Sequence, residues 1–310
     1  MNQNGIIVKD LKVYYGNIKA VDGISFEVQE GNVFGMLGPN GAGKTTTIET
    51  IVGLTKKKSG QISVFGYNPE DEIEEIKKII GVQLQSPSLF PRLTVKETIE
   101  LFASFYPAPK EIREVIEIMG LEKKINTKVA DLSGGQRHRL AVGLAVVSNG
   151  KALFFDEPTT GLDPQARRQL WDVILSLKKE GKTIFITTHY MDEAEKLCDE
   201  LLIIDHGKII ASGAPTSLIK ESFQETAVEF LDPEFSGEEK EELLALKLAD
   251  RVNYEAGENR IIMYTNEVSD TIKGLIDFVS SKGKKLRDVM VRHATLEDVF
   301  IKLTGRGIRE

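Results

Sequence analysis

Cysteine, histidine and long apolar segments are scarce in this sequence. The 310-residue chain holds one cysteine, Cys198, and four histidines that lie far apart. A single cysteine excludes an intramolecular disulfide framework, and scattered histidines do not suggest a zinc site. The longest apolar run, Leu140 to Val147, is far shorter than the ~20 residues that cross a bilayer, and no signal-like layout opens the chain. We therefore expect a cytoplasmic protein that needs a partner for any membrane role.

Basic residues are also fewer than acidic ones. Lysine and arginine total 40 against 47 aspartates and glutamates, so the net charge is -7. This balance disfavours a protein that coats nucleic acid, and we expect no nucleic-acid partner. The chain also lacks internal repeats and low-complexity tracts. Its length suits one large domain with a small one.

One glycine-rich stretch carries phosphate-binding chemistry. It fits the pattern G-x-x-x-x-G-K-[ST], and the residues that form it or directly follow it are Gly38, Pro39, Asn40, Gly41, Ala42, Gly43, Lys44, Thr45 and Thr46. Glycines let backbone N–H groups turn toward an anion, the lysine can reach the β- and γ-phosphates, and the next hydroxyl can bind Mg²⁺. The pattern predicts a strand over 32–37 and a helix over 46–52, which places the phosphates at a helix N-terminus.

A second apolar strand ends in two carboxylates. Leu153, Phe154 and Phe155 precede Asp156 and Glu157. Downstream of a phosphate-binding loop, such a strand can bring the first carboxylate beside Thr45 to hold Mg²⁺ through water. The second carboxylate can then polarise the attacking water. We therefore predict Thr45 and Asp156 as metal residues and Glu157 as the general base.

A second anion-binding edge is predicted at the start of another helix. Leu132 precedes Ser133, Gly134, Gly135 and Gln136, and Ser133 is expected to cap a helix over 137–148. Taken alone, these glycines would fit an ordinary helix start. With one phosphate-binding loop already in the chain, a head-to-tail dimer explains both edges, because ATP would lie between the loop of one copy and this edge of the other.

Together these motifs resemble the ATP-binding cassette (ABC) ATPases, whose signature is the Leu-Ser-Gly-Gly-Gln sequence. The resemblance covers residues 5–222. It implies that Tyr15 stacks on adenine, with Tyr14 as the competing aromatic, and that Gln85 contacts Mg²⁺ and water, with Gln83 close by. It also implies that Asp163 lies in a loop that crosses the dimer interface, and that His189 contacts the γ-phosphate.

The alternation of strand-like and helix-like stretches predicts an α/β P-loop fold for residues 1–223. We expect an ABC-type nucleotide-binding domain with an antiparallel β part, a parallel α/β core and an inserted helical subdomain at about 86–148. Residues 69–132 look helical, with apolar residues at helical spacing over 96–105 and 110–119. For residues 224–310 we expect a small α+β accessory or dimerisation domain. Its predicted elements are a helix opened by the acidic run 238–242, a hairpin over 252–265 that turns at Gly257, and helices over 270–281 and 295–303.

Two further stretches, 88–97 and 294–306, resemble the nucleotide-binding subunits of bacterial drug-resistance-type exporters. Gln136 departs from that subgroup, many of whose members carry methionine there. The resemblance implies an ATP-hydrolysing subunit of an ABC exporter that uses ATP and Mg²⁺. It would work as a homodimer with two ATPs at its interface, bound to a separate transmembrane permease at the inner face of the cell membrane.

Two other classes are the alternatives. Soluble ABC ATPases of translation or DNA repair usually carry two cassettes or a long inserted coiled coil, and this chain has one phosphate-binding loop and no sustained heptads. A metabolic P-loop kinase would not explain the signature, Asp163 and His189 together.

Overall fold

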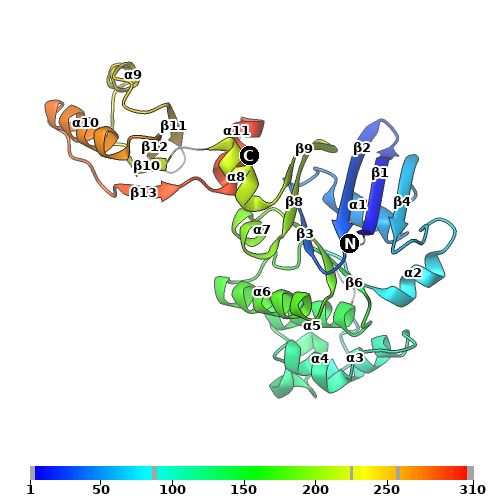
Figure 1. The fold of residues 1–310 in the computed structure, drawn as a ribbon. Helices are drawn as coiled ribbons and strands as arrows, with labels where there is room; N and C mark the ends of the chain where they lie inside the picture. Colours follow the sequence, from blue (N-terminus) through cyan, green and yellow to red (C-terminus); the bar gives the residue numbers. More distant parts are fainter. Residues whose placement is uncertain (1–3, 86–88, 224–225, 256–258, 306–310) are drawn as a thin grey trace. The chain divides into compact units, whose positions relative to one another are not determined.

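The computed structural model describes residues 4–85, 89–223, 226–255 and 259–305, and it forms two compact units, each with its own sheet or sheets (Figure 1). Of the described residues, those up to 215 form the first unit and those from 216 to 305 form the second. Helix α8 (Pro215–Ser222) therefore groups with the C-terminal unit, whereas the predicted domain boundary at 223 assigned it to the N-terminal domain. The roles expected of the two domains stay predictions.

An antiparallel sheet opens the first unit. Its strand order is β2-β1-β4, with β1 (Asn4–Tyr15) in the centre between β2 (Ile18–Gln29) and β4 (Ser59–Val64). Alternating apolar residues of β2 point inward and polar ones outward, as the period-2 pattern predicts. The predicted antiparallel part is confirmed.

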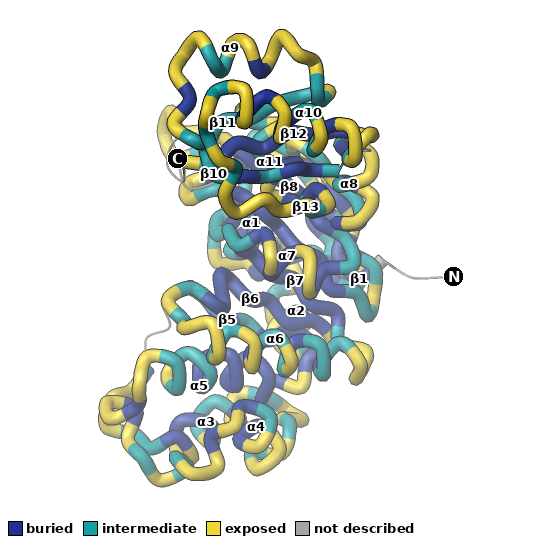
Figure 2. Tube along the Cα trace, turned by 90° about the vertical axis from the view of Figure 1, so that its left-hand side faces the viewer, coloured by how far each residue is buried: buried dark blue, intermediate teal, exposed yellow. Residues whose placement is uncertain are grey.

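The second sheet of this unit is mostly parallel. Its six strands run in the order β5 (Ile80–Gln83), β6 (Ala152–Asp156), β7 (Thr183–Thr188), β3 (Val33–Leu37), β8 (Glu200–Asp205) and β9 (Lys208–Gly213). Only the last pair, β8 with β9, is antiparallel. The strands β3, β6 and β7 are buried at every position, as Figure 2 shows for β6 and β7, because layers cover both faces of the sheet.

Four phenylalanines join the two sheets in one core. Phe26 of β2 stacks on Phe34 of β3 with ring centroids 5.2 Å apart, and Phe34 lies 5.5 Å from Phe185 of β7. Phe154 of β6 continues the row at 5.8 Å from Phe185. Aromatic pairs at these separations add to the free energy of apolar burial. The row fixes the antiparallel sheet against the strands that end at the phosphate-binding loop.

Helices complete the first unit. Those that follow strands are α1 (Lys44–Ile51), α2 (Ile73–Ile79), α6 (Pro164–Lys179) and α7 (Met191–Leu197). A helical insertion between β5 and β6 contains α3 (Val95–Ala103), α4 (Ile112–Ile118), 3-10 turns at Glu122–Lys124 and Val129–Asp131, and α5 (Gly134–Val146). The start of this insertion, residues 86–88, lies outside the described residues, including Ser88 of the exporter-like stretch.

The expectation that residues 69–132 are helical is wrong at β5. This strand pairs in parallel with β6, from Ile80 opposite Ala152 to Gln83 opposite Phe155. Periodicity alone cannot distinguish so short an apolar run from a helical turn, and here pairing with the sheet decides its structure.

The lone cysteine fills a space left by a glycine. Cys198, just after α7, is buried, and a Cβ placed on Gly35 of β3 would lie 2.4 Å from its sulfur. Burial raises the pKa of the Cys198 thiol far above its ordinary value, and the charge of the nearby Asp199 raises it further. The thiol is therefore a packing group with little thiolate character.

The second unit is a four-stranded antiparallel sheet with helices. Its strands run in the order β11 (Arg251–Glu255), β12 (Arg260–Thr265), β10 (Thr226–Leu231) and β13 (Met290–His293). Its helices after α8 are α9 (Gly237–Ala245), α10 (Val268–Ser281) and α11 (Leu296–Thr304). The predicted helices and the pairing of β11 with β12 are confirmed, whereas β10 and β13 were not predicted. The expected turn at Gly257 lies outside the described residues, as does Arg306 at the end of the exporter-like stretch.

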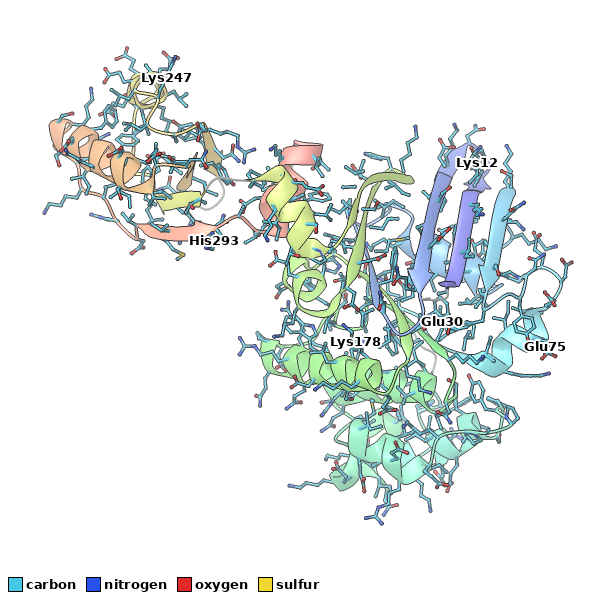
Figure 3. The ribbon with its side chains drawn as sticks, in the orientation of Figure 1. Lys12, Glu30, Glu75, Lys178, Lys247 and His293 are labelled. Carbon is cyan, nitrogen blue, oxygen red and sulfur yellow. The ribbon has the colours of Figure 1, made fainter. Side chains whose placement is uncertain are left out.

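Charged side chains project from the outer surfaces of both units (Figure 3). In the described ranges, no helix combines the length and the apolar character needed to cross a bilayer.

Candidate functional site

The phosphate-binding loop connects the end of β3 to the start of α1. Gly43 has φ 109°, and a Cβ there would lie 2.4 Å from the Ala20 carbonyl oxygen, so only glycine fits. Helix α1 begins at Lys44, two residues earlier than predicted, and its first turn presents Thr45 and Thr46, both partly exposed. Backbone N–H groups in a first helical turn have no partner within the helix and are suited to bind an anion.

The Lys44 side chain folds back over the loop. Its Nζ donates to the carbonyl oxygens of Gly38 at 2.7 Å and Pro39 at 3.0 Å, and it forms an ion pair with Glu157 Oε1 at 3.0 Å. Both charged side chains are 4% exposed. The sequence predicted both residues as site residues and did not predict that they pair.

Glu157 is the centre of the site. Its Oε2 lies 3.1 Å from His189 Nδ1, and it accepts hydrogen bonds from Thr160 Oγ1 at 3.1 Å and Gln85 Nε2 at 3.4 Å. Burial alone would raise the pKa of Glu157, but the hydrogen bond with His189 and the charge of Lys44 outweigh it and lower the pKa to about 2. The carboxylate is therefore ionised at neutral pH, as a general base requires.

The backbone of Glu157 is strained. Its φ is 48°, in the left-handed region that residues other than glycine seldom occupy. Its N–H donates to Thr187 Oγ1 at 3.0 Å and to the Thr187 carbonyl oxygen at 3.2 Å, which anchors the turn to β7. Strain of this kind persists only when the surroundings hold it in place, and it is frequent at functional sites.

Asp156 has the features of a cation ligand. It is fully buried, its Oδ1 accepts a hydrogen bond from Thr187 Oγ1 at 2.5 Å, and its Oδ2 has no hydrogen-bond partner among the described residues. Burial raises the pKa of Asp156, while the hydroxyls of Thr187 and Thr45 partly oppose that rise. The carboxyl group of Asp156 is near the Thr45 hydroxyl and keeps one buried oxygen unpartnered, which fits Mg²⁺, since this ion binds such oxygen ligands.

Two glutamines near the site differ in their contacts. Gln83 is buried in β5, and its Nε2 donates to the backbone oxygens of Leu84 at 2.7 Å and Asp156 at 3.3 Å. Gln85 is exposed and reaches the Glu157 carboxylate. The contacts of Gln83 are structural, and this difference supports Gln85 as the glutamine of the site.

The signature residues form the N-terminus of α5. Ser133 Oγ accepts from Gln136 N at 3.3 Å while Gln136 Oε1 accepts from Ser133 N at 3.1 Å, which is a capping box. The predicted cap is confirmed, and the helix begins three residues earlier than expected, at Gly134. Ser133 and Gly134 are exposed, and a Cβ on Gly134 would meet no atom within 4 Å. The edge is open to a ligand or a second molecule.

Asp163 caps helix α6. Its Oδ1 accepts from the backbone N–H groups of Gln165 at 3.0 Å and Ala166 at 2.9 Å. The sequence predicted this residue as part of the nucleotide interface, and within one chain its carboxylate shapes the loop that follows Glu157.

The two candidate adenine-stacking aromatics are held differently. Tyr14 Oη donates to Asp22 Oδ1 at 2.5 Å, and the Lys58 Nζ lies 4.4 Å from its ring centroid. Tyr15 is 50% exposed. A base would find one face of the Tyr14 ring already covered, whereas much of the Tyr15 ring is open.

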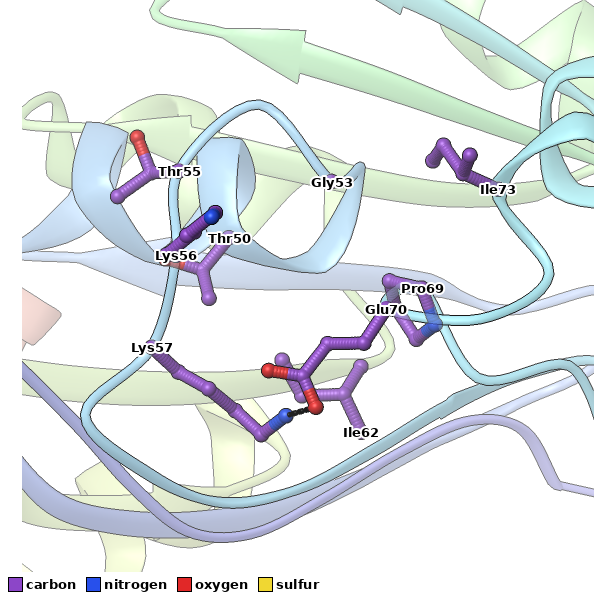
Figure 4. A pocket seen from close by; sticks show the side chains of 9 residues that line it. All are labelled: Thr50, Gly53, Thr55, Lys56, Lys57, Ile62, Pro69, Glu70 and Ile73. Atoms are coloured by element: carbon purple, nitrogen blue, oxygen red, sulfur yellow. Dashed lines mark ion pairs between the residues drawn. The ribbon is translucent and has the colours of Figure 1, made fainter.

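A cavity elsewhere in the first unit does not belong to this site. It has a volume of about 420 Å³ and lies between the end of α1 and the segment before α2 (Figure 4). Its lining includes Lys57 and Glu70, which form an ion pair. None of the predicted site residues lines the cavity, so it is separate from the phosphate-binding loop.

Known proteins resemble the chain over most of its length. Residues 21–160 match the family model described as ABC transporter. A Nod factor export ATP-binding protein I of Ralstonia nicotianae is 38% identical over 98% of this chain and 94% of its own length. The solved ADP conformation of MJ1267, an ATP-binding cassette of an ABC transporter, is 28% identical with a TM-score of 0.63, covering 71% of this chain and 94% of that one. A dimeric post-hydrolysis state of the cassette MJ0796 with ADP and Pi is 25% identical with a TM-score of 0.62, covering 67% and 98%.

Proposed function

Because this chain belongs to the ABC transporter family and is the ATP-hydrolysing subunit of an exporter of that family, we propose specific roles for the residues around Glu157. The observation that carries the proposal is the convergence of Lys44, His189 and Gln85 on one ionised carboxylate at the end of β6. The export relatives do not favour the alternative of a soluble ABC ATPase in translation or DNA repair.

In the proposed reaction, Glu157 accepts a hydrogen bond from the attacking water and takes its proton as the water oxygen bonds to the γ-phosphorus of ATP. The bond from that phosphorus to the bridging oxygen breaks, which leaves ADP and inorganic phosphate. Lys44 turns from Glu157 toward the β- and γ-phosphates, and His189 donates to the γ-phosphate. Residues 38–46 cradle the phosphates, and Tyr15 stacks on the adenine.

We propose that Thr45, Asp156 and Gln85 hold Mg²⁺. The ion would neutralise charge on the β- and γ-phosphate oxygens when bound. The buried Oδ2 of Asp156, which lacks a hydrogen-bond partner in the described part of the chain, supports this assignment.

We propose that a second copy of the chain completes each ATP-binding site. Ser133, Gly134, Gly135 and Gln136 of one copy would bind the γ-phosphate held by the other, with Asp163 at the crossing loop. The exposed, capped start of α5 supports this arrangement, since it offers backbone N–H groups and a positive helix end. Two ATPs would then join the copies as a homodimer, and the second unit would serve as an accessory or dimer-stabilising domain.

A groove in the first unit supports a separate membrane-embedded permease as the partner. The groove has a volume of about 680 Å³, and its lining includes Leu54, Ile80, Val82 and Phe105. Leu54 is 61% exposed and Phe105 is 67% exposed, which is costly for side chains of this size unless a partner covers them. Leu84 also lines the groove and directly precedes Gln85, which donates a hydrogen bond to Glu157. An apolar permease helix bound in this groove could therefore change the position of Gln85 relative to Glu157. We place the chain at the cytoplasmic face of the cell membrane through this contact.

Charged substitutions in the groove are expected to separate the chain from its permease. Leu54→Asp or Phe105→Asp should strongly reduce the amount of a multi-span protein that copurifies from detergent-solubilised membranes with ATP and Mg²⁺, because a carboxylate would be buried unpaired at the contact. Ile276→Asp, on an exposed position of α10, is the matched control and should leave copurification unchanged. Unchanged recovery with both groove variants would exclude this docking surface. If the wild-type chain copurified with ribosomes, DNA-repair proteins or nothing, the transport function itself would be rejected.

Truncating Tyr15 is expected to weaken ATP binding. Stacking of a base on an aromatic ring contributes about 1–3 kcal/mol, so Tyr15→Ala should raise the Kd for ATP roughly tenfold or more while Tyr15→Phe leaves it near the wild-type value. Titration calorimetry or a fluorescent ATP analogue would measure the difference. If Tyr14→Ala weakens binding and Tyr15→Ala does not, the stacking role belongs to Tyr14.

A further inference from the structure

A fully buried carboxyl group joins the two segments that carry the proposed catalytic residues. Glu193 of α7 is 0% exposed, and its Oε1 accepts a hydrogen bond from the Trp171 indole nitrogen of α6 at 3.0 Å. The hydroxyls of Thr159 and Thr188 also face this carboxyl. Thr159 lies in the turn just after Glu157, and Thr188 directly precedes His189.

The surroundings of Glu193 do not suit a negative charge. No lysine, arginine or histidine in the described ranges forms an ion pair with it, and the nearby acidic groups are Asp192 and the Cys198 thiol. An unpaired carboxylate in a protein interior is strongly unfavourable. Burial raises the pKa of Glu193, while the hydrogen bond from Trp171 and the facing hydroxyls of Thr188 and Thr159 only partly oppose that rise.

Two oxygens at this position have unused hydrogen-bonding capacity. Glu193 Oε2 and Thr159 Oγ1 are both buried, and each lacks a hydrogen-bond partner among the residues described. A protonated carboxyl oxygen is a donor and a threonine hydroxyl is an acceptor, so protonation of Glu193 would satisfy both atoms.

We propose that Glu193 is a positioning residue held as a neutral carboxylic acid, which keeps its proton, donates a hydrogen bond to Thr159 Oγ1 and thereby fixes the turn of Glu157 against the end of β7. The backbone around it is part of the site: Gly38 N donates to the Thr188 carbonyl oxygen at 3.3 Å, and Thr160 N donates to the Glu157 carbonyl oxygen at 3.2 Å. The kinetic consequence rests on the proposed roles of Glu157 and His189, whereas the protonation state of Glu193 can be tested without them.

The first test compares the pH dependence of stability in the wild type, Glu193→Gln and the matched control Glu195→Gln, an exposed position of the same helix. Trp171 is the only tryptophan, so its fluorescence reports denaturant unfolding of the unit that contains Glu193. The pKa of Glu193 in the folded state is raised from 4.5. The contribution of protonated Glu193 to the unfolding free energy is therefore complete below pH 4.5, and it is lost as the pH rises toward the raised pKa. In that window the folding equilibrium constant of the wild type should fall by about tenfold per pH unit relative to Glu193→Gln. Parallel profiles of the two proteins would show an ionised carboxylate and overturn the proposal.

The second test measures ATP hydrolysis by the same full-length proteins. Glu193→Gln keeps a neutral donor of the same shape, so its kcat should stay within about twofold of the wild type. Glu193→Ala and Thr159→Val should each lower kcat on the order of tenfold or more, with little change in the KM for ATP, because misplacing a catalytic group by a fraction of an ångström is costly. Wild-type kcat in Thr159→Val, or a Glu193→Gln enzyme as slow as Glu193→Ala, would overturn the proposal. If Glu157→Gln instead turned over normally, the proposed function would fail while the pH test of Glu193 would still stand.

Discussion

Glu157→Gln is expected to stop ATP turnover while ATP binding persists. The amide has the shape of the carboxylate but cannot take a proton from water, and general-base catalysis contributes a factor of about 10²–10⁴. ATP affinity should be equal or higher, because Lys44 is paired with Glu157 and the substitution frees it for the phosphates. With hydrolysis blocked, two copies joined by ATP should remain together.

Steady-state ATPase assays, an ATP-binding isotherm and light scattering with ATP and Mg²⁺ would test these three expectations together. Glu75→Gln is the control, since Glu75 is a surface carboxylate of α2 (Figure 3) and pairs with the exposed Lys78. Turnover by Glu157→Gln within a few-fold of the wild type would remove Glu157 from the mechanism.

Lys44→Ala is expected to cause the largest loss of ATP affinity. Hydrogen bonds to charged groups contribute about 1.5–3 kcal/mol, so losing the lysine should raise the Kd for ATP by roughly 10- to 100-fold. Lys57→Ala is the matched control, because Lys57 lies beyond the other end of α1 and pairs with Glu70 in the cavity of Figure 4. An unchanged Kd in Lys44→Ala, or an equal loss in Lys57→Ala, would disprove the assignment of the phosphate site.

The same substitution should also destabilise the nucleotide-free protein. Removing Lys44 leaves the buried carboxylate of Glu157 without its cation, which should cost about 1–3 kcal/mol of unfolding free energy. Because the penalty arises from the unpaired charge, Lys44→Ala/Glu157→Gln should recover part of that loss. Denaturant unfolding of the two single variants and the double variant would measure the coupling, and additive effects would show that the pair is not important for stability.

Local chemistry explains why the phosphate-binding parts of the site could be predicted from the sequence. The loop at 38–45, the cap at Ser133 and the carboxylates that end β6 each depend on residues adjacent in the chain, and each occurs in the structure as a strand end or a helix start. The exporter family and the α/β fold followed from these motifs and are confirmed by the relatives and the solved cassettes.

Pairings between distant segments could not be predicted in the same way. The contact of Lys44 with Glu157 and the anchoring of Glu157 to Thr187 depend on how β3, β6 and β7 align in the sheet. The left-handed backbone of Glu157 has no signal in the residue type. The strand β5 was missed because a short apolar run does not show that it will pair with β6. The network around Glu193 was missed because the sequence does not show that this glutamate, one of several in its helix, is buried against Trp171.

The packing of Cys198 against Gly35 has a practical consequence for site-specific fluorescent labelling of the protein. A thiol that is buried and held protonated should be inert toward maleimide dyes under native conditions. The wild-type chain can therefore serve as its own background for labelling, with no cysteine to remove first. A new cysteine at an exposed position such as Asp131, beside the signature, could carry a fluorophore that would report the proposed association and dissociation of two copies in real time.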